Sequence, residues 1–239
     1  MSNPNGPYPG RQLFLGLTVE NRPAIAYLVT GRSKESRERK AVPVENTFRM
    51  GPLGNIAYDP LRHYTAVKYD NASGIAAVGN GIQTEAVYET YKLLFNVNTP
   101  PATDYMTKIM DGADAEPDSY HTPRIAGVIS SKDGVPILIV GIKSYNQPAG
   151  AVRAELQPGT MMGISTYKGN MDTPEATSPS APLAKLEFSG KTPEALAKYV
   201  YDISQAVYKG EDIRVCTIGM ILAADNLTWN ASIINAHQN

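Results

Sequence analysis

The feature that most constrains how this 239-residue chain folds is a series of short apolar runs arranged in pairs around turn-forming residues. The pairs are residues 13–18 with 24–30, 64–69 with 74–78, and 125–130 with 136–142. The residues between their members are Glu20-Asn-Arg-Pro23, Asp70-Asn-Ala-Ser73 and Lys132-Asp-Gly134. Short apolar runs separated by such residues predict β-hairpins. The chain is therefore expected to build antiparallel sheets.

A first block of helix is expected just after the second hairpin. Apolar residues from Val87 to Phe95 recur at helical spacing, with Thr84 as the expected N-cap. Pro100 and its neighbour end this helix, and a second short helix then runs through Met106.

The clearest helix is expected near the C-terminus. Thr192 is its expected N-cap and Pro193 its first residue, and the helix should bury Val207 and stop at Gly210. Further strands are expected at 163–168, 183–188 and 213–223, and polar loops at 31–40 and 173–182. Strands in hairpins and helices in blocks indicate an α+β fold with antiparallel sheets.

Composition limits the function. The formal net charge of −1 provides no field for nucleic acid or an anionic membrane. The single cysteine, Cys216, excludes an internal disulfide, and no metal, dinucleotide or phosphate-loop motif is present. The start of the chain lacks the order of a signal peptide, and its apolar runs are too short to span a bilayer. We expect one cytoplasmic domain over residues 1–239 with a flexible tail at 1–9, and no cofactor or metal.

Residues 114–127 have the composition of an active-site loop that leads into a buried strand. Three carboxylates, Asp114, Glu116 and Asp118, precede Tyr120, His121, Thr122 and Arg124. Such groups at the mouth of a strand suit acid–base chemistry. The alternative is a solvated acidic loop whose Arg124 pairs with a neighbouring carboxylate.

Other polar clusters also fall at the expected strand ends. They are Gly10-Arg11, Gly31-Arg-Ser33, Tyr58-Asp-Pro-Leu-Arg62, Asn80-Gly-Ile-Gln-Thr-Glu85 and Tyr120-His-Thr-Pro-Arg124. Arginine is a planar donor fork that fits phosphate oxygens, and a turn into a helix offers backbone N–H groups to an anion. Taken singly, each is also explained by a solvated arginine or an ordinary turn.

In combination, these clusters resemble the archaeal-type IMP cyclohydrolase family. The resemblance extends over about residues 8–170 and lies in the order of the motifs. That order is Gly-Arg, Arg-Ser, Tyr followed by Leu-Arg, Asn-Gly with Thr, and an acidic loop that ends in Tyr-x-Thr-Pro-Arg-Ile-Ala. The last of these motifs is the most specific. Two positions depart from the family pattern: Gln83 stands where the family has His, and Glu85 where it has Asp.

The resemblance implies a fold, an activity and a set of site residues. The implied fold is the four-layer αββα sandwich of two antiparallel sheets found in N-terminal nucleophile hydrolases. The implied reaction closes 5-formamidoimidazole-4-carboxamide ribotide to IMP with loss of water, without cofactor. The implied partner is a small purine ribonucleotide, with neither nucleic acid nor membrane, and a homo-oligomer is left open.

The implied site residues fall into two sets. The catalytic set is Tyr58, Glu116, Asp118, Tyr120 and Arg124. The substrate-binding set is Arg11, Arg32, Ser33, Arg62, Asn80, Gly81, Gln83, Thr84 and Thr122. Tyr58 or Tyr120 is expected to donate to the formyl oxygen, and Glu116 or Asp118 to accept a proton. Replacing Arg124 or Glu116 by Ala is expected to abolish turnover and leave the fold intact.

Two other functions remain open at this point. One is a non-catalytic nucleotide-binding relative, which Gln83 favours because Gln does not take up a proton as His does. The other is an N-terminal nucleophile amidohydrolase in which Ser2 would be the nucleophile after removal of Met1.

Overall fold

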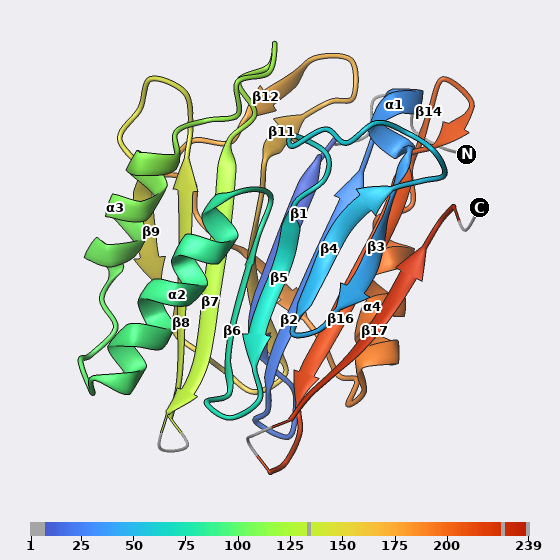
Figure 1. The fold of residues 1–239 in the computed structure, drawn as a ribbon. Coiled ribbons are helices and arrows are strands. Elements are labelled where there is room, and N and C mark those ends of the chain that lie inside the picture. The colour runs from blue at the N-terminus through green and yellow to red at the C-terminus, as the bar shows by residue number, and fades with distance from the viewer. Residues whose placement is uncertain (1–7, 133–134, 226–227, 238–239) are drawn as a thin grey trace.

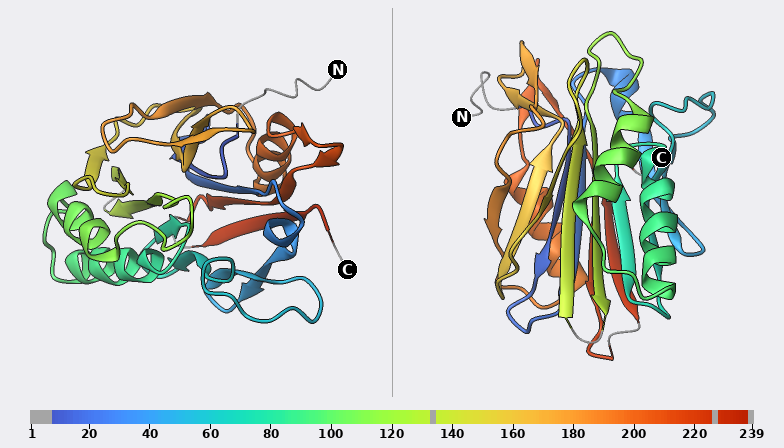
Figure 2. Two further views of the ribbon diagram at one scale, coloured as in Figure 1. Left: turned by 90° about the horizontal axis from the view of Figure 1, so that it is seen from above. Right: turned by 90° about the vertical axis from the view of Figure 1, so that its left-hand side faces the viewer.

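The computed structural model describes residues 8–132, 135–225 and 228–237, and it is an α+β structure dominated by antiparallel sheets. Two large sheets lie face to face, and helices cover their outer surfaces (Figure 1). Figure 2 shows the stacked sheets from above and from the side, with α2 (Gln83–Asn96) and α3 (Thr103–Ala113) on one side of them.

The first sheet has six strands, and all of its pairings are antiparallel. In spatial order they are β13 (Ala184–Glu187), β10 (Thr160–Ser165), β1 (Arg11–Leu17), β2 (Pro23–Thr30), β16 (Arg214–Leu222) and β17 (Trp229–Asn235). The outer face of this sheet packs against α4 (Pro193–Ile203), where Leu196 and Val200 contact Ala26 and Leu28 of β2 in one apolar cluster.

The second sheet has seven strands, also antiparallel. In spatial order they are β3 (Arg39–Val44), β4 (Thr47–Pro52), β5 (Thr65–Asp70), β6 (Ile75–Gly79), β7 (Arg124–Lys132), β8 (Val135–Lys143) and β9 (Gly150–Arg153). Its outer face packs against α2 and α3 through residues such as Val87 and Met106. Smaller elements complete the chain: α1 (Lys34–Arg37), β11 (Tyr167–Gly169) with β12 (Pro174–Ala176), and β14 (Val207–Tyr208) with β15 (Glu211–Asp212).

The main core lies between the two sheets. Side chains of a strand alternate between its faces, and in β2 Ile25, Tyr27 and Val29 enter this core while Ala26 and Leu28 face α4. Because both faces of the central strands are buried, these strands are almost continuously apolar, as the sequence already indicates.

The three predicted hairpins are confirmed as β1–β2, β5–β6 and β7–β8, although residues 133–134 of the last turn lie outside the described residues. The two helices around Pro100 are also confirmed. Thr84 as N-cap is wrong, because the cap position is Ile82 and the Thr84 side chain is buried in the first turn.

Four other expectations need correction. The predicted loop 31–40 contains α1 and the start of β3, and the predicted loop 173–182 contains β12. The predicted strand 213–223 is followed by a further strand, β17. The predicted tail 1–9 is wrong for Tyr8, whose backbone N–H donates to Gly169 and whose ring stacks on Tyr167; residues 1–7 lie outside the described residues.

The last helix ends at Ile203, earlier than the expected stop at Gly210. Val207 is only partly buried and lies in β14, which turns into β15 at Lys209 and Gly210. These two residues have φ angles of 50° and 84°. Positive φ at two successive residues is typical of a tight hairpin turn, so Gly210 serves a hairpin and not a helix cap.

Thr192 caps α4 as expected, because its side chain accepts a hydrogen bond from the backbone N–H of Ala195 at 3.2 Å. Replacing it with Ala leaves that N–H without a protein partner. We predict that Thr192→Ala lowers the free energy of unfolding by about 1 kcal/mol in urea denaturation. Thr192→Ser retains the hydroxyl and should stay close to the original value; equal losses for both variants would contradict the cap.

Among the described residues, no helix is both long and apolar enough to cross a membrane.

Candidate active site

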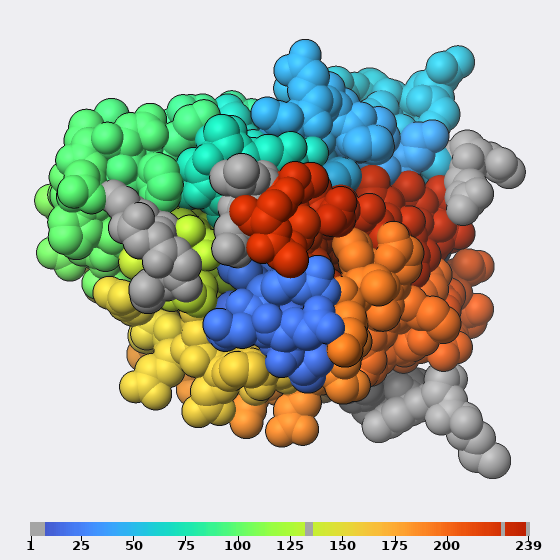
Figure 3. All heavy atoms as spheres, turned by 90° about the horizontal axis from the view of Figure 1, so that it is seen from below, coloured from blue at the N-terminus to red at the C-terminus, as the bar shows by residue number. Residues whose placement is uncertain are grey.

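The predicted site residues gather at one end of the stacked sheets. In antiparallel sheets the starts of β1, β3 and β7 lie beside the ends of β2, β4 and β6. This is the upper end in Figure 1, where α1, β11, β12 and β14 also lie, and the left view of Figure 2 looks down on it. The opposite end, shown in Figure 3, is built from hairpin turns such as those between β1 and β2 and between β16 and β17, and none of the predicted site residues lies in those turns.

The centre of the site is the carboxylate of Glu116, which is 2% exposed. Its Oε1 accepts three hydrogen bonds: from Nη2 of Arg11, from Nη1 of Arg124 at 3.2 Å, and from Nδ2 of Asn80 at 3.1 Å. Among the described residues, none donates to Oε2. One carboxylate oxygen is therefore fixed by two cations and an amide, and the other is left available for a ligand.

The loop that carries Glu116 is closed by its own side chains. Asp118 accepts hydrogen bonds from the backbone N–H of Thr122 at 2.8 Å and from the Thr122 hydroxyl. The N–H of Glu116 donates to the Thr122 carbonyl at 2.9 Å. His121 has a φ angle of 46°, a value that His adopts more readily than most residues. Asp114 combines φ 53° with ψ 178°, a conformation that residues other than glycine rarely adopt. These contacts turn Glu116 inward toward the sheets.

Asn80 links the end of β6 to the start of β7. Its Oδ1 accepts from the N–H of Ile125 at 2.8 Å and from Nε2 of Gln83 at 2.9 Å. Its Nδ2 donates to the Pro123 carbonyl at 2.9 Å as well as to Glu116. Gln83 also donates to the carbonyl of Ile125 at 2.9 Å, so its buried side chain fixes the orientation of Asn80.

The two arginines that bond to Glu116 have different electrostatic surroundings. Burial is the largest single influence on Arg11 and lowers its pKa, but Glu116 together with Tyr64 and Tyr27 outweighs burial and holds this pKa well above its ordinary value. Burial lowers the pKa of Arg124, and Arg11 lowers it further, against the attraction of Glu116. The difference follows from the closer contact of Glu116 with Arg11. A guanidinium starts from so high a pKa that both groups remain charged near neutral pH.

A second group of predicted residues adjoins the first. The Arg32 guanidinium carbon lies 4.9 Å from the ring centre of Tyr8 and 5.3 Å from that of Tyr120. Tyr8 stacks on Tyr167, whose hydroxyl forms a hydrogen bond with Thr122. Arg32 and Tyr120 are thus connected through aromatic contacts to the loop that carries Glu116.

Three predicted residues are engaged away from this centre. Arg62 donates to Asp59 at 2.7 Å and to the carbonyl of Glu35 at 2.8 Å. The Ser33 hydroxyl accepts the backbone N–H of Ser36 as the N-cap of α1. The Tyr58 side chain is 72% exposed on the loop between β4 and β5. The structure places these residues at the same end of the sheets as Glu116 but outside its hydrogen-bonded cluster.

Gly81 and Thr84 flank the cluster. A Cβ atom on Gly81 would overlap Nη1 of Arg124, so this position lets the guanidinium lie directly against the backbone. The Thr84 hydroxyl is buried and has no hydrogen-bond partner among the described residues. Both observations are compatible with the predicted role of this turn in ligand binding.

The sequence interpretation missed three buried polar residues at this end. Arg39, at the start of β3, is 2% exposed. The hydroxyls of Tyr27 and Tyr64 form a hydrogen bond of 2.8 Å between the two sheets. Arg39 follows several charged residues in the sequence, and the segment was therefore interpreted as an exposed polar loop. Tyr27 lies within a continuous run of core residues, so its sequence neighbours do not mark it as a site residue.

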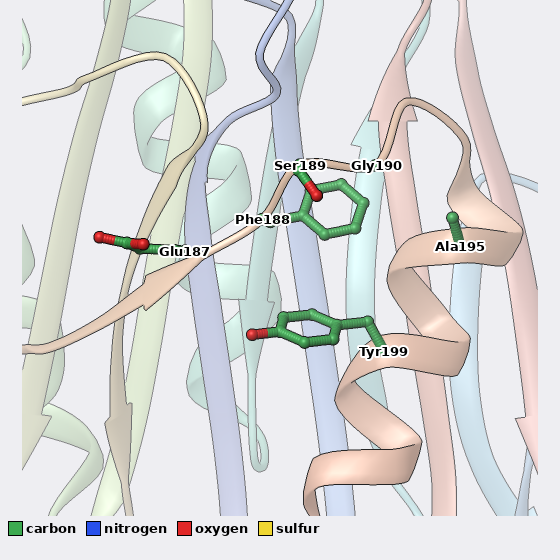
Figure 4. Close-up of a pocket in the computed structure, with 6 residues that line it drawn as sticks. All are labelled: Glu187, Phe188, Ser189, Gly190, Ala195 and Tyr199. Atoms are coloured by element: carbon green, nitrogen blue, oxygen red, sulfur yellow. The ribbon is translucent and has the colours of Figure 1, made fainter.

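Other parts of the molecule offer fewer groups suited to catalysis or binding. Within the described part of the chain, no three His, Cys, Asp or Glu side chains are grouped as a metal site would require. Burial raises the pKa of the Cys216 thiol to about 12, so it is not a ready nucleophile. A hollow of about 300 Å³ beside α4 is lined by Phe188 and Tyr199 among others (Figure 4), but it lies near Glu187, which pairs with the Thr160 end of β10 away from Arg11.

Comparisons with known proteins identify the family of this chain. Residues 8–226 match the family model described as IMP cyclohydrolase-like protein. A Methanococcus maripaludis protein named IMP cyclohydrolase is 30% identical over 200 residues, covering 83% of this chain and 89% of that protein. Proteins of the same name from Methanocaldococcus jannaschii (26%; 89% and 99% covered) and Halobacterium salinarum (32%; 69% and 76% covered) are also similar. The extent of these matches shows that the chain belongs to the IMP cyclohydrolase-like protein family.

Proposed function

We propose that this protein is an IMP cyclohydrolase, which closes 5-formamidoimidazole-4-carboxamide ribotide to IMP with loss of water. The observation that carries the proposal is the buried Glu116 carboxylate between Arg11 and Arg124, one oxygen of which accepts no hydrogen bond from the described residues. Ring closure needs no external nucleophile, because the carboxamide nitrogen and the formyl carbon belong to one molecule. The protein has to hold these two groups in attack geometry and to move protons.

Glu116 is the carboxylate best placed to accept a proton from the attacking carboxamide nitrogen. Its Oε2 is not used by other protein groups within the described residues, whereas both oxygens of Asp118 bond to Thr122. As the N–C bond forms, the formyl oxygen takes on negative charge, which the Arg124 guanidinium is placed to stabilise. The formyl oxygen then leaves as water after taking up two protons. One of them balances the proton lost from the carboxamide nitrogen, and the other balances the proton lost from the formamido nitrogen as the ring C=N bond forms.

The remaining predicted residues are assigned to binding. Arg11 and Arg32, with Asn80, Gly81, Thr84 and Thr122, are proposed to hold the ribose and phosphate. Tyr120, next to Arg32, is the stronger candidate for a tyrosine donor. Arg62, Ser33 and Tyr58 would need to leave their present contacts to reach a ligand in the same site, so we assign them peripheral roles. The substrate is a small purine ribonucleotide.

Gln83 is the feature that favours a non-catalytic relative, and its contacts weaken that alternative. Its amide nitrogen donates to Asn80 and Ile125, which is a positioning role that an amide performs without any proton transfer. The N-terminal nucleophile alternative depends on Ser2, which lies outside the described residues. Two antiparallel sheets between outer helices support the proposal that the whole chain forms one four-layer αββα sandwich of the N-terminal nucleophile hydrolase type.

The proposed function is tested by combining two measurements on the full chain. A spectrophotometric assay follows IMP formation from the formamido substrate, and calorimetry measures IMP binding. Turnover together with binding supports the cyclohydrolase, whereas binding without turnover identifies the non-catalytic relative. Absence of both would refute the proposal.

A further inference from the structure

Arg39 is a buried cation for which the described residues supply no counter-ion. Its side chain is at the start of β3, and its Nε and Nη1 atoms have no hydrogen-bond partner within the described part of the chain. No ion pair to Arg39 is found among those residues either. A buried, unpaired guanidinium costs the free protein several kcal/mol. A buried group without partners calls for an explanation, and a bound anion is one that fits a cation.

The alternation of strand faces shows where Arg39 points. In β3, Arg39 and Ala41 are buried on the same face, and Ala41 belongs to the core between the sheets. In β1, Arg11 shares a face with Leu13 and Leu15, which belong to the same core. The two arginines come from opposite sheets, and both extend into the space between them at the end where the site lies.

The Tyr27–Tyr64 pair lies in the same region. Each hydroxyl carries one proton, and the bond between the two uses only one of them. Burial raises the pKa of Tyr27 well above its ordinary value, and the charges of Arg11 and Arg39 both act against that rise. One O–H donor and the free N–H groups of Arg39 thus remain available at the same place.

The charge balance of the interior indicates what could fill this place. The buried side chains that are charged at neutral pH, among the described residues, are Arg11, Arg39, Arg124 and Glu116. Three positive charges and one negative charge leave a net charge of +2. A phosphate monoester carries about −1.5 to −2 at neutral pH, and guanidinium groups bind its oxygens through paired hydrogen bonds.

We infer that Arg39, together with Arg11 and the Tyr27–Tyr64 pair, forms a receptor between the two sheets for negatively charged oxygen atoms of the bound nucleotide. This inference rests on the proposed function and adds to it a binding residue. The oxygens come from the phosphate of the ligand or from the oxyanion that develops at the formyl group. The experiment below separates these two sources.

The test compares the full chain with Arg39→Met, which replaces the guanidinium by an uncharged side chain of similar length. Arg49→Met is the matched control, because Arg49 is exposed on β4 of the same hairpin. Without ligand, we expect the unfolding midpoint of Arg39→Met in urea to equal or exceed that of the unmodified chain. A residue with a structural role would instead lower it.

Ligand binding then identifies the source of the oxygens. If Arg39 binds the phosphate, Arg39→Met weakens calorimetric binding of IMP roughly 10- to 100-fold and leaves binding of inosine unchanged. If it binds the oxyanion, IMP binding is retained and kcat falls by a similar factor. Wild-type values of both IMP affinity and kcat in Arg39→Met, or a variant that fails to fold, would overturn the inference.

Failure of the proposed function gives a different result. In that case the unmodified chain itself neither binds IMP nor forms it. Inorganic phosphate is then the probe: the receptor requires that phosphate raise the melting temperature of the unmodified chain and of Arg49→Met but not that of Arg39→Met. An equal rise in all three proteins would refute the receptor without reference to IMP.

Discussion

Replacing Glu116 with Gln is expected to reduce kcat for IMP formation by roughly 10²- to 10⁴-fold, the range for removal of a general base. The substitution keeps the size of the side chain and an oxygen that Arg11, Arg124 and Asn80 can still approach. It removes the negative charge and the oxygen that is proposed to take the proton. The spectrophotometric assay measures this loss directly.

The same variant should also be less stable. Without the carboxylate, the guanidinium groups of Arg11 and Arg124 remain buried with no counter-charge, which costs about 3–5 kcal/mol when one member of a buried ion pair is removed. For this reason Glu116→Ala, which the sequence suggests would leave the fold intact, is a poorer choice than Gln. Assays at low temperature and a urea denaturation curve separate lost catalysis from lost folding.

Two further variants make the Glu116 prediction specific. Glu175→Gln removes an exposed carboxylate of β12 and should leave kcat and stability unchanged. Glu116→Asp retains the charge but shortens the reach, so it should recover most of the stability and little of the activity. Wild-type turnover in Glu116→Gln would exclude Glu116 as the proton acceptor.

The sequence predicted those parts of the fold that depend on neighbouring residues. The hairpins β1–β2, β5–β6 and β7–β8 were found because each turn lies between the two apolar runs that pair. Strands β3, β4 and β17 were missed, since their exposed faces carry residues such as Arg49 and Asn230 and their runs are not continuously apolar. The pairing of β16 with β2 joins distant parts of the chain and has no local signal.

For the site as well, the sequence indicated what depends on neighbouring residues but not what depends on tertiary contacts. The residue types of the acidic loop and of the start of β7 suggested a site, the resemblance to the family singled out Glu116 and Arg124, and these two side chains do lie together. The choice between Glu116 and Asp118 was not available from the sequence, because it depends on Asp118 being used by Thr122. Arg39 was missed because its role follows from strand pairing and burial rather than from a motif.

Replacing Gly81 with Ala is expected to reduce kcat by about 100-fold or more while the protein still folds. A Cβ at this position would overlap Nη1 of Arg124 and lie 3.0 Å from its Cζ and 3.1 Å from Oε1 of Gln83. The atoms in the way are the far ends of flexible side chains, so the guanidinium moves and the backbone does not. Displacement of a catalytic group by about 1 Å has effects of this size on rate.

Gly112→Ala is the matched control, because a Cβ there meets no atom within 4 Å and the residue lies in α3. It should keep full activity and gain up to about 1 kcal/mol of stability from the better helix propensity of Ala. Gly81→Ala should lose only about 1 kcal/mol. An active Gly81→Ala enzyme would mean that Arg124 can leave Glu116 without consequence for the reaction.

A double-mutant cycle shows whether the effect of Gly81 passes through Arg124. Arg124→Met alone removes the guanidinium that Gly81 accommodates, so adding Gly81→Ala to it should cause no further loss of kcat. If the two losses multiply instead, Gly81 acts on the reaction independently, through the backbone of the turn before α2. The Arg124–Glu116 contact would then be a structural ion pair, and the proton acceptor and the oxyanion donor would have to be sought elsewhere at this end of the sheets.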